Sequence, residues 1–208
     1  MLFGSVLGQV YSVEKRLEFK IYYHQKKQNL RSHEMIDLLV TGKTWRQSKD
    51  QSEGIWRYNT DADTRRKFNN QFSIGWTQTD TTGFIDNEVK LWIHPPRHNQ
   101  YTLTETSPFP DIRKKLNFGD QYTSVLFVGK GWGDLSGKKI KSTYTISKIK
   151  REKDETLWTI NAVSEFEGKT NTAKFIYSSK EGFIFIHYTF YNGDEMKMKL
   201  IKNEASLK

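Results

Sequence analysis

The stretch Leu91-Trp-Ile-His-Pro-Pro-Arg-His-Asn-Gln-Tyr-Thr-Leu-Thr-Glu-Thr-Ser-Pro-Phe-Pro110 decides the fold, because it contains all 4 prolines of the chain. Proline fixes φ and has no N–H to donate, so it cannot lie inside a paired strand. Just before the first two prolines, Val89, Leu91 and Ile93 follow the two-residue period of a half-buried strand. We therefore expect a strand that ends at His94, followed by a rigid connector.

Alternating apolar and polar residues on both sides of this connector predict antiparallel strands. In the first of them, Leu17, Phe19, Ile21 and Tyr23 share one face. The expected strands cover residues 17–24, 35–41, 54–58, 68–76, 84–94, 101–104, 122–128, 140–149, 157–166, 172–177, 183–191 and 195–201. The polar segments 59–64 and 80–83 are expected to be a loop and a turn, and no segment predicts a helix.

The connections between the later strands are short, which indicates a meander. One of them, Asn192-Gly193, matches a type I′ hairpin turn, in which both residues take positive φ. About eleven strands in one sheet must curl, close or fold over. We therefore predict an all-β fold, a single-domain antiparallel barrel or strongly curled sheet.

The N-terminal residues resemble the end of a secretory signal. A short apolar run is followed by the small residues Gly4, Ser5 and Gly8 before Gln9, although an ordinary first strand would also explain this pattern. We expect residues 1–9 to be a remnant of a signal peptide and residues 10–208 to form one antiparallel β domain that is periplasmic or secreted. No segment has the length of a transmembrane helix, and the absence of cysteine excludes disulfides.

The charge balance makes an anionic partner plausible. Lysine and arginine number 33 against 24 acidic residues, which gives a net charge of +9. A lipid headgroup, a glycan or another anionic amphiphile would suit this charge, which also favours solubility. Basic clusters such as 65–67 and 113–115 point away from the core on several sides and contain no nucleic-acid motif, so no nucleic-acid partner is expected.

Five short motifs resemble, in their order, uncharacterised secreted proteins of Bacteroidota. The strand-rich second half also resembles, loosely, periplasmic proteins of the lipoprotein-carrier class with a curled antiparallel sheet. The motifs are Trp92–Arg97, Ser107–Pro110, Gly119–Tyr122, Gly182–Ile184 and Tyr191–Gly193. The resemblance covers about half of the chain, and it implies export and an all-β fold but no catalytic residue.

Familiar catalytic and metal motifs are incomplete in this sequence. His94 and His98 have the spacing of a helical metal pair, but the Pro-Pro-Arg between them forbids a helix. The run 59–63 lacks the glycine and glutamate that complete a calcium loop, and 129–133 lacks the end of a phosphate loop. No cofactor or metal is expected, and catalysis has no recognisable nucleophile.

The candidate ligand-binding residues are Trp92, Arg97, Tyr101 and Trp132. Aromatic rings and a guanidinium at one mouth of a barrel can bind a sugar, a lipid or an anionic headgroup, although core packing also explains such aromatics. Three functions stay open. In decreasing preference, they are a non-enzymatic envelope protein that binds an apolar or amphiphilic ligand in a curled sheet, an interaction or assembly protein that uses sheet edges and a basic face, and a hydrolase with an unrecognised carboxylate site.

Overall fold

All the described strands belong to one antiparallel sheet. The computed structural model describes residues 9–46, 48–68, 76–129 and 135–205. The strands are β1 (Lys15–Gln25), β2 (Leu30–Thr44), β3 (Ser52–Asn59), β4 (Thr79–Asp86), β5 (Lys90–Ile93), β6 (Asp111–Arg113), β7 (Gln121–Phe127), β8 (Lys139–Arg151), β9 (Thr156–Phe166), β10 (Lys169–Ser178), β11 (Gly182–Thr189) and β12 (Glu195–Ala205). Their spatial order is β6-β5-β4-β3-β2-β1-β12-β11-β10-β9-β8-β7, which confirms the predicted fold class.

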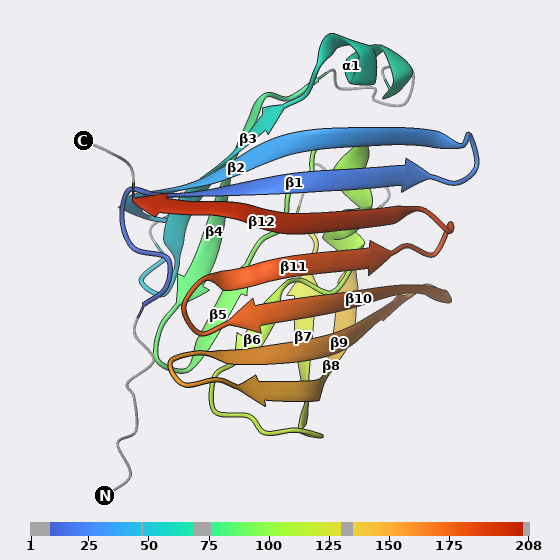
Figure 1. The fold of residues 1–208 in the computed structure, drawn as a ribbon. Helices are drawn as coiled ribbons and strands as arrows, with labels where there is room; N and C mark the ends of the chain where they lie inside the picture. The colour runs from blue at the N-terminus through green and yellow to red at the C-terminus, as the bar shows by residue number, and fades with distance from the viewer. Residues whose placement is uncertain (1–8, 47, 69–75, 130–134, 206–208) are drawn as a thin grey trace, which may run out of the picture.

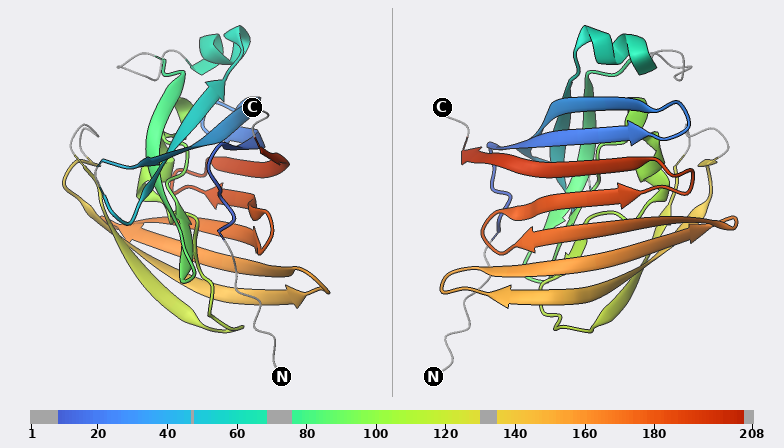
Figure 2. Two further views of the ribbon diagram at one scale, coloured as in Figure 1. Left: turned by 90° about the vertical axis from the view of Figure 1, so that its left-hand side faces the viewer. Right: turned by 45° about the vertical axis from the view of Figure 1, so that its right-hand side comes forward.

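The sheet is strongly curled but remains open. Every strand pairs with its neighbour in sequence, except that β1 pairs with β12 and that β6 and β7 are the two edges. Figures 1 and 2 show β4 and β5 running behind β1, β12 and β11, so the two halves of the curled sheet face each other. We call the gap between the edges β6 and β7 the seam.

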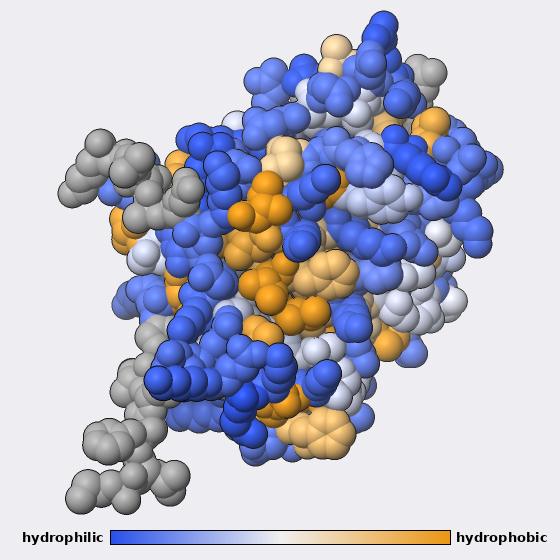
Figure 3. Space-filling view, in the orientation of Figure 1, coloured by the Kyte–Doolittle hydropathy of each residue, from blue (hydrophilic) through white to orange (hydrophobic). Residues whose placement is uncertain are grey.

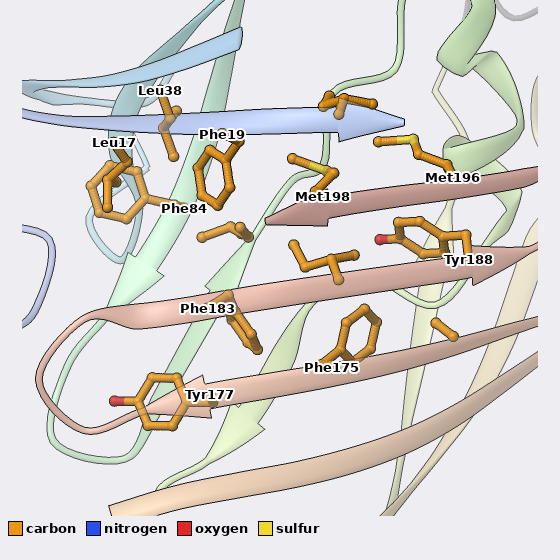
Figure 4. Packing of buried hydrophobic residues seen from close by; sticks show 14 of the residues in the cluster. Leu17, Phe19, Leu38, Phe84, Phe175, Tyr177, Phe183, Tyr188, Met196 and Met198 are labelled. Carbon is orange, nitrogen blue, oxygen red and sulfur yellow. The ribbon is translucent and has the colours of Figure 1, made fainter. Parts of the chain in front are cut away.

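Large apolar side chains fill the space between the two halves. Phe19 on β1 and Phe175 and Phe183 on β10 and β11 point inward from one half (Figure 4). From the other half, Trp56 on β3 contacts Phe19, and Phe84 on β4 belongs to the same core. These side chains are almost completely buried because each strand directs alternate residues to the concave face. The predicted two-residue period therefore builds the core of the protein.

The strands found over residues 79–93 differ from the prediction. The single strand expected over 84–94 is two strands, β4 and β5, and the turn expected at 80–83 lies inside β4. The reversal occurs at Asn87, whose side-chain oxygen accepts hydrogen bonds from the backbone N–H groups of Val89 and Lys90. Asparagine forms such turns readily, so a polar residue inside an apolar alternation broke the strand. Strand β5 ends at Ile93, which is one residue before the predicted end at His94 and two residues before Pro95.

Two helical segments contradict the expectation of a chain without helices. Helix α1 (Ala62–Phe68) stands where a loop and the start of a strand were expected. Asp61 precedes it and its carboxylate accepts the backbone N–H of Thr64, which is the bond of a helix N-cap. The 3-10 helix η2 (Asn99–Thr106) replaces the strand expected over 101–104. Of the strand expected over 68–76, residues 69–75 lie outside the described residues, and Trp76 is not in a strand.

The turn at Asn192-Gly193 is not type I′. Gly193 has a φ of +85°, but Asn192 is not among the residues with positive φ. The N–H of Gly193 bonds to the carbonyl of Phe190, and Asp194 caps the turn by bonding to the Asn192 side chain. One positive φ therefore suffices for this hairpin.

The segment before β1 is anchored to the sheet from residue 10 onward. The N–H groups of Val10 and Tyr11 both donate to the buried carboxylate of Asp86, at 2.6 and 2.7 Å. The ammonium of Lys114, equally buried, donates to the other oxygen of Asp86 at 2.8 Å. In the described part of the chain, no helix is long and apolar enough to cross a membrane.

Candidate functional site

The proline-rich connector bridges the two halves of the sheet. The carbonyl of Thr106, at the end of η2, accepts hydrogen bonds from Ser164 of β9 and Asn171 of β10, at 2.8 and 3.0 Å. Three residues later, the carbonyl of Phe109 accepts a bond of 3.0 Å from the hydroxyl of Tyr144 on β8. Each of these groups is buried, so the bonds are shielded from water and hold the connector in place.

Arg97 lies on the connector within a buried cluster of charged groups. Its Nε donates to Asp80 of β4 at 3.0 Å, and its Nη1 donates to Nε2 of His94 at 2.6 Å. Glu105 lies 3.9 Å from the same guanidinium, and His98 lies 3.4 Å from Asp80. Two carboxylates therefore surround the guanidinium that was predicted to bind an anionic ligand.

The protonation states of this cluster follow from burial and from the charge of Arg97. Burial, followed by the neighbouring guanidinium, lowers the pKa of His94 to about 3, so its Nε2 is free to accept the Arg97 bond. Burial raises the pKa of Glu105 to about 7, against the attraction of Arg97. Burial would also raise the pKa of Asp80, but the His98 hydrogen bond and the Arg97 charge outweigh it and hold that pKa below its ordinary value.

Tyr101 lies in the core. Its ring is completely buried, stacks on Tyr58 with a centroid distance of 6.1 Å and meets Tyr23 edge-on at 5.8 Å. The hydroxyl of Tyr58 in turn accepts a bond of 3.3 Å from the backbone N–H of Arg97. Tyr101 therefore anchors the connector to the hydrophobic core, which is the alternative role that core packing suggested for it.

Trp92 lies in a slot at the seam. The slot has a volume of about 210 Å³ and lies between the two ends of the sheet, because its lining comes from β4, β5 and the connector on one side and from β7 and β8 on the other. Its lining residues are Gln51, Ile85, Lys90, Trp92, Ser107, Phe109, Ser124, Val125, Leu126, Ser142 and Tyr144. Aromatic rings, one cation and three serine hydroxyls therefore share a single cavity.

The cation of the slot is Lys90, two residues before Trp92 on the same face of β5. Its ammonium lies 5.9 Å from the centre of the Trp92 ring, and burial lowers its pKa against the attraction of Asp111. On the facing strand β6, Asp111 is completely buried, and Arg113 is 3.8 Å away. In the described part of the chain, neither carboxylate oxygen of Asp111 has a hydrogen-bond partner.

The structure therefore separates the predicted binding residues. Trp92 and Arg97 both contact His94, but only Trp92 lines the slot, while Tyr101 lies in the core and Trp132 lies outside the described residues. Sequence reasoning missed Lys90 and Tyr144, which reach the slot because the curl brings β5 and β8 together. Neither residue belongs to a local motif, so the sequence held no signal for this pairing.

Searches for related sequences returned nothing: no protein-family model and no curated protein matches this chain. Several solved structures share its general shape at very low identity. One, from Bacteroides fragilis, is described as an exported protein with a YmcC-like fold, with a TM-score of 0.48 and 8% identity over 95% of this chain and 100% of that one. A lipoprotein structure from Parabacteroides distasonis has a TM-score of 0.46 and 10% identity, over 93% and 96% of the two chains.

A third structure is described as an outer membrane lipoprotein-sorting protein domain from Vibrio parahaemolyticus. It matches with a TM-score of 0.39 and 10% identity, over 93% of this chain and 86% of that one. At these identities and scores the likeness concerns the curled sheet and carries no residue across.

Proposed function

We propose that this protein is an exported, non-enzymatic envelope protein that binds an anionic amphiphile at the seam of its curled sheet. The observation that carries the proposal is the slot, which joins aromatic walls, a lysine and three serines in one cavity between the sheet edges. Large side chains fill the interior of the sheet, so the ligand occupies the seam and not the core.

The slot suits the head of an amphiphile. The ammonium of Lys90 offers a charge for a phosphate or carboxylate, and the hydroxyl of Ser124 offers a hydrogen bond. The hydroxyl of Ser107 already donates to the carbonyl of Leu103, so it narrows the slot without donating to the ligand. The ring of Trp92 offers an apolar face for the first carbons of a chain or for a sugar. We assign the cationic role to Lys90, because Arg97 is held by Asp80.

The edge strand β7 provides a path for the apolar part of the ligand. Val125 lines the slot and is 63% exposed, and Phe127 on the same strand is 62% exposed. Both side chains would bury apolar surface against an acyl chain that leaves the slot, and each buried methylene contributes about 0.8 kcal/mol. Exposed apolar residues on an edge strand otherwise favour aggregation, so a ligand that covers them has a physical advantage.

The test is a binding titration with single-chain amphiphiles. Lysophosphatidylglycerol, lysophosphatidylcholine and a soluble glycan panel are compared by calorimetry, with the wild type and with Lys90→Gln and Trp92→Ala. We expect the anionic lysolipid to bind best, and Lys90→Gln to weaken it about tenfold or more, the range for a hydrogen bond to a charged group. Trp92→Ala should weaken all amphiphiles to a similar degree.

A second lysine–aromatic pair supplies the matched control. Lys169 lies 4.7 Å from the ring centre of Tyr191, and neither residue lines the slot, so the variants Lys169→Gln and Tyr191→Ala change the same kinds of group outside it. These variants should leave the affinity unchanged. If no amphiphile binds, or if both pairs matter equally, the proposed site is wrong, and the interaction-protein hypothesis takes its place.

A further inference from the structure

The convex face of β10, β11 and β12 carries an apolar hollow that the seam does not explain. Figure 3 shows an orange area in the middle of this face, enclosed by blue, hydrophilic surface. The hollow has a volume of about 670 Å³ and opens to solvent. Its apolar lining residues are Ile176, Ile184, Phe185, Leu200 and Ile201. Strand residues on a convex face are ordinarily polar, so this cluster departs from the alternation that builds the rest of the sheet.

Two β-bulges lie at this hollow. In the β10–β11 ladder, Ile176 faces Phe185 and Tyr177 faces Phe183, so Ile184 is the extra residue. In the β1–β12 ladder, Glu18 faces Lys202 and the next residue pairs with Leu200, so Ile201 is the extra residue. Both extra residues are isoleucines, and both line the hollow, where Ile201 is 44% exposed. Bulges redirect side chains and recur at functional positions, so we interpret the exposed Ile201 and the half-buried Ile184 as functional and not accidental.

Lysines border the apolar hollow. One row across the sheet runs from Ile176 on β10 through Phe185 on β11 to Lys199 on β12 and Lys20 on β1. Lys199 and Lys20 thus face each other directly, which is unfavourable for like charges on neighbouring strands. In the described part of the chain, neither ammonium lies within ion-pair distance of a carboxylate. An anion bound over the row would relieve this repulsion.

The acidic groups beside the hollow are already engaged. Glu181 lines it, but its carboxylate accepts a hydrogen bond from Asn203. Glu18 lies opposite Lys202 and is 3.7 Å from Arg16. Asn203 is neutral and leaves Glu181 charged, but Lys20, Lys199 and Lys202 outnumber it, so the net charge beside the hollow is positive.

We propose that this face docks the protein on an anionic lipid surface. The isoleucines and Phe185 enter the headgroup region, while Lys199, Lys20 and Lys202 contact lipid phosphates. Long lysine side chains keep their charge at the polar level while their stems lie along apolar surface, and this combination of apolar centre and lysine rim is what interfacial binding requires. The proposal does not depend on the seam, because the two surfaces share no residue.

The first test is co-sedimentation of the intact protein with vesicles. Phosphatidylcholine vesicles are compared with vesicles that also contain phosphatidylglycerol, in low and in high salt. We expect binding to the anionic vesicles only, weakened by salt. Lys199→Gln and Lys202→Gln should each lower it about fivefold, the equivalent of about 1 kcal/mol for one lysine near an anionic surface. Lys148→Gln and Lys150→Gln remove the same charge from the part of β8 that does not pair with β7, and they should have little effect.

The second test asks which face meets the lipid. Because the chain has 0 cysteines, Ile201→Cys and Val89→Cys each give one site for an environment-sensitive fluorophore. The label at 201 should shift to the blue on anionic vesicles, and the label at 89, exposed in the turn between β4 and β5, should not. Absence of vesicle binding, equal losses in the β8 variants, or an unshifted label at 201 would each overturn the proposal. The first of these outcomes would leave the face to an acidic protein partner, and none of them bears on the amphiphile titration.

Discussion

The strands β8–β12 and the connector over 94–110 both contribute buried residues, but the strands bury mainly apolar side chains and the connector also buries charged ones. The strands bury apolar side chains such as Ile160 and Phe175, each supplied by the two-residue period of its own strand. The connector buries Arg97, which pairs with Asp80 of β4 and with Glu105 of the connector itself. It also buries the carbonyl of Thr106, whose partners Ser164 and Asn171 lie far away in sequence on β9 and β10. Apolar burial can therefore be anticipated from local pattern, whereas polar burial depends on which distant groups the fold brings together.

Among the tests of this difference, removing Arg97 should change the free energy of unfolding most. The Arg97→Ala variant leaves Asp80 and Glu105 buried beside a missing cation, so we expect unfolding by urea at neutral pH to lose about 3 to 5 kcal/mol. The exposed Lys174 on β10 is the control, and Lys174→Ala should change stability by less than about 0.5 kcal/mol. A loss below about 1 kcal/mol for Arg97→Ala would show that water, and not the guanidinium, compensates the two carboxylates.

The pH dependence of stability tests the buried charges of the connector separately, because Glu105 should change its protonation state in the folded protein near neutral pH. Burial raises its pKa from 4.5 to about 7, so the folded protein keeps a proton that the unfolded chain releases. The stability from this group is complete below the ordinary pKa and is lost as pH rises toward about 7. Glu105→Gln cannot titrate, so its stability relative to the wild type should improve by about 3 kcal/mol across that interval.

Urea unfolding of both proteins over a pH series measures this difference. Burial and Arg97 lower the pKa of His94, so His94 contributes in the opposite sense, and its contribution is lost as pH falls below the ordinary value of 6.5. His94 is present in both proteins but lies 3.6 Å from Glu105, so the difference between the curves is read most directly above pH 6.5, where His94 is neutral in the folded and unfolded states. Stability curves that stay parallel over the whole pH range would mean that Glu105 is ionised in the folded protein.

The smallest expected effect belongs to the strands, at the turn between β11 and β12. Gly193→Val puts a β-branched residue at a φ of +85° and should cost about 1 kcal/mol or more. Gly129 has ordinary φ and open space around it, so Gly129→Val serves as the control and should be close to neutral. Equal melting temperatures for the two variants would show that the turn adapts by moving Lys26, whose side chain lies next to Gly193.

The sequence predicted the curled all-β fold because most strands show, within their own residues, the two-residue apolar period of a half-buried strand. It placed the end of β5 at the proline stop for the same reason, since proline acts on its own residue. The seam slot was out of reach, because Trp92 and Tyr144 meet only through the curl of the whole sheet. Arg97 was predicted to bind a ligand, but its buried neighbours Asp80 and Glu105 formed no pattern from which the sequence could show the ion pair.

The pairing of β1 with β12 sets the order in which the sheet can be completed. The partners Lys15 and Ala205 are separated by nearly the whole chain, and their contact lies in the middle of the sheet, while the free edges β6 and β7 are adjacent in sequence. The ladder between β1 and β12 can therefore form only after β12 has been synthesised. Until then, the edge of β1 that pairs with β12 has no partner. A circular permutant opened at residues 115–119, with the original ends joined, would turn this late long-range step into an ordinary hairpin and should fold faster.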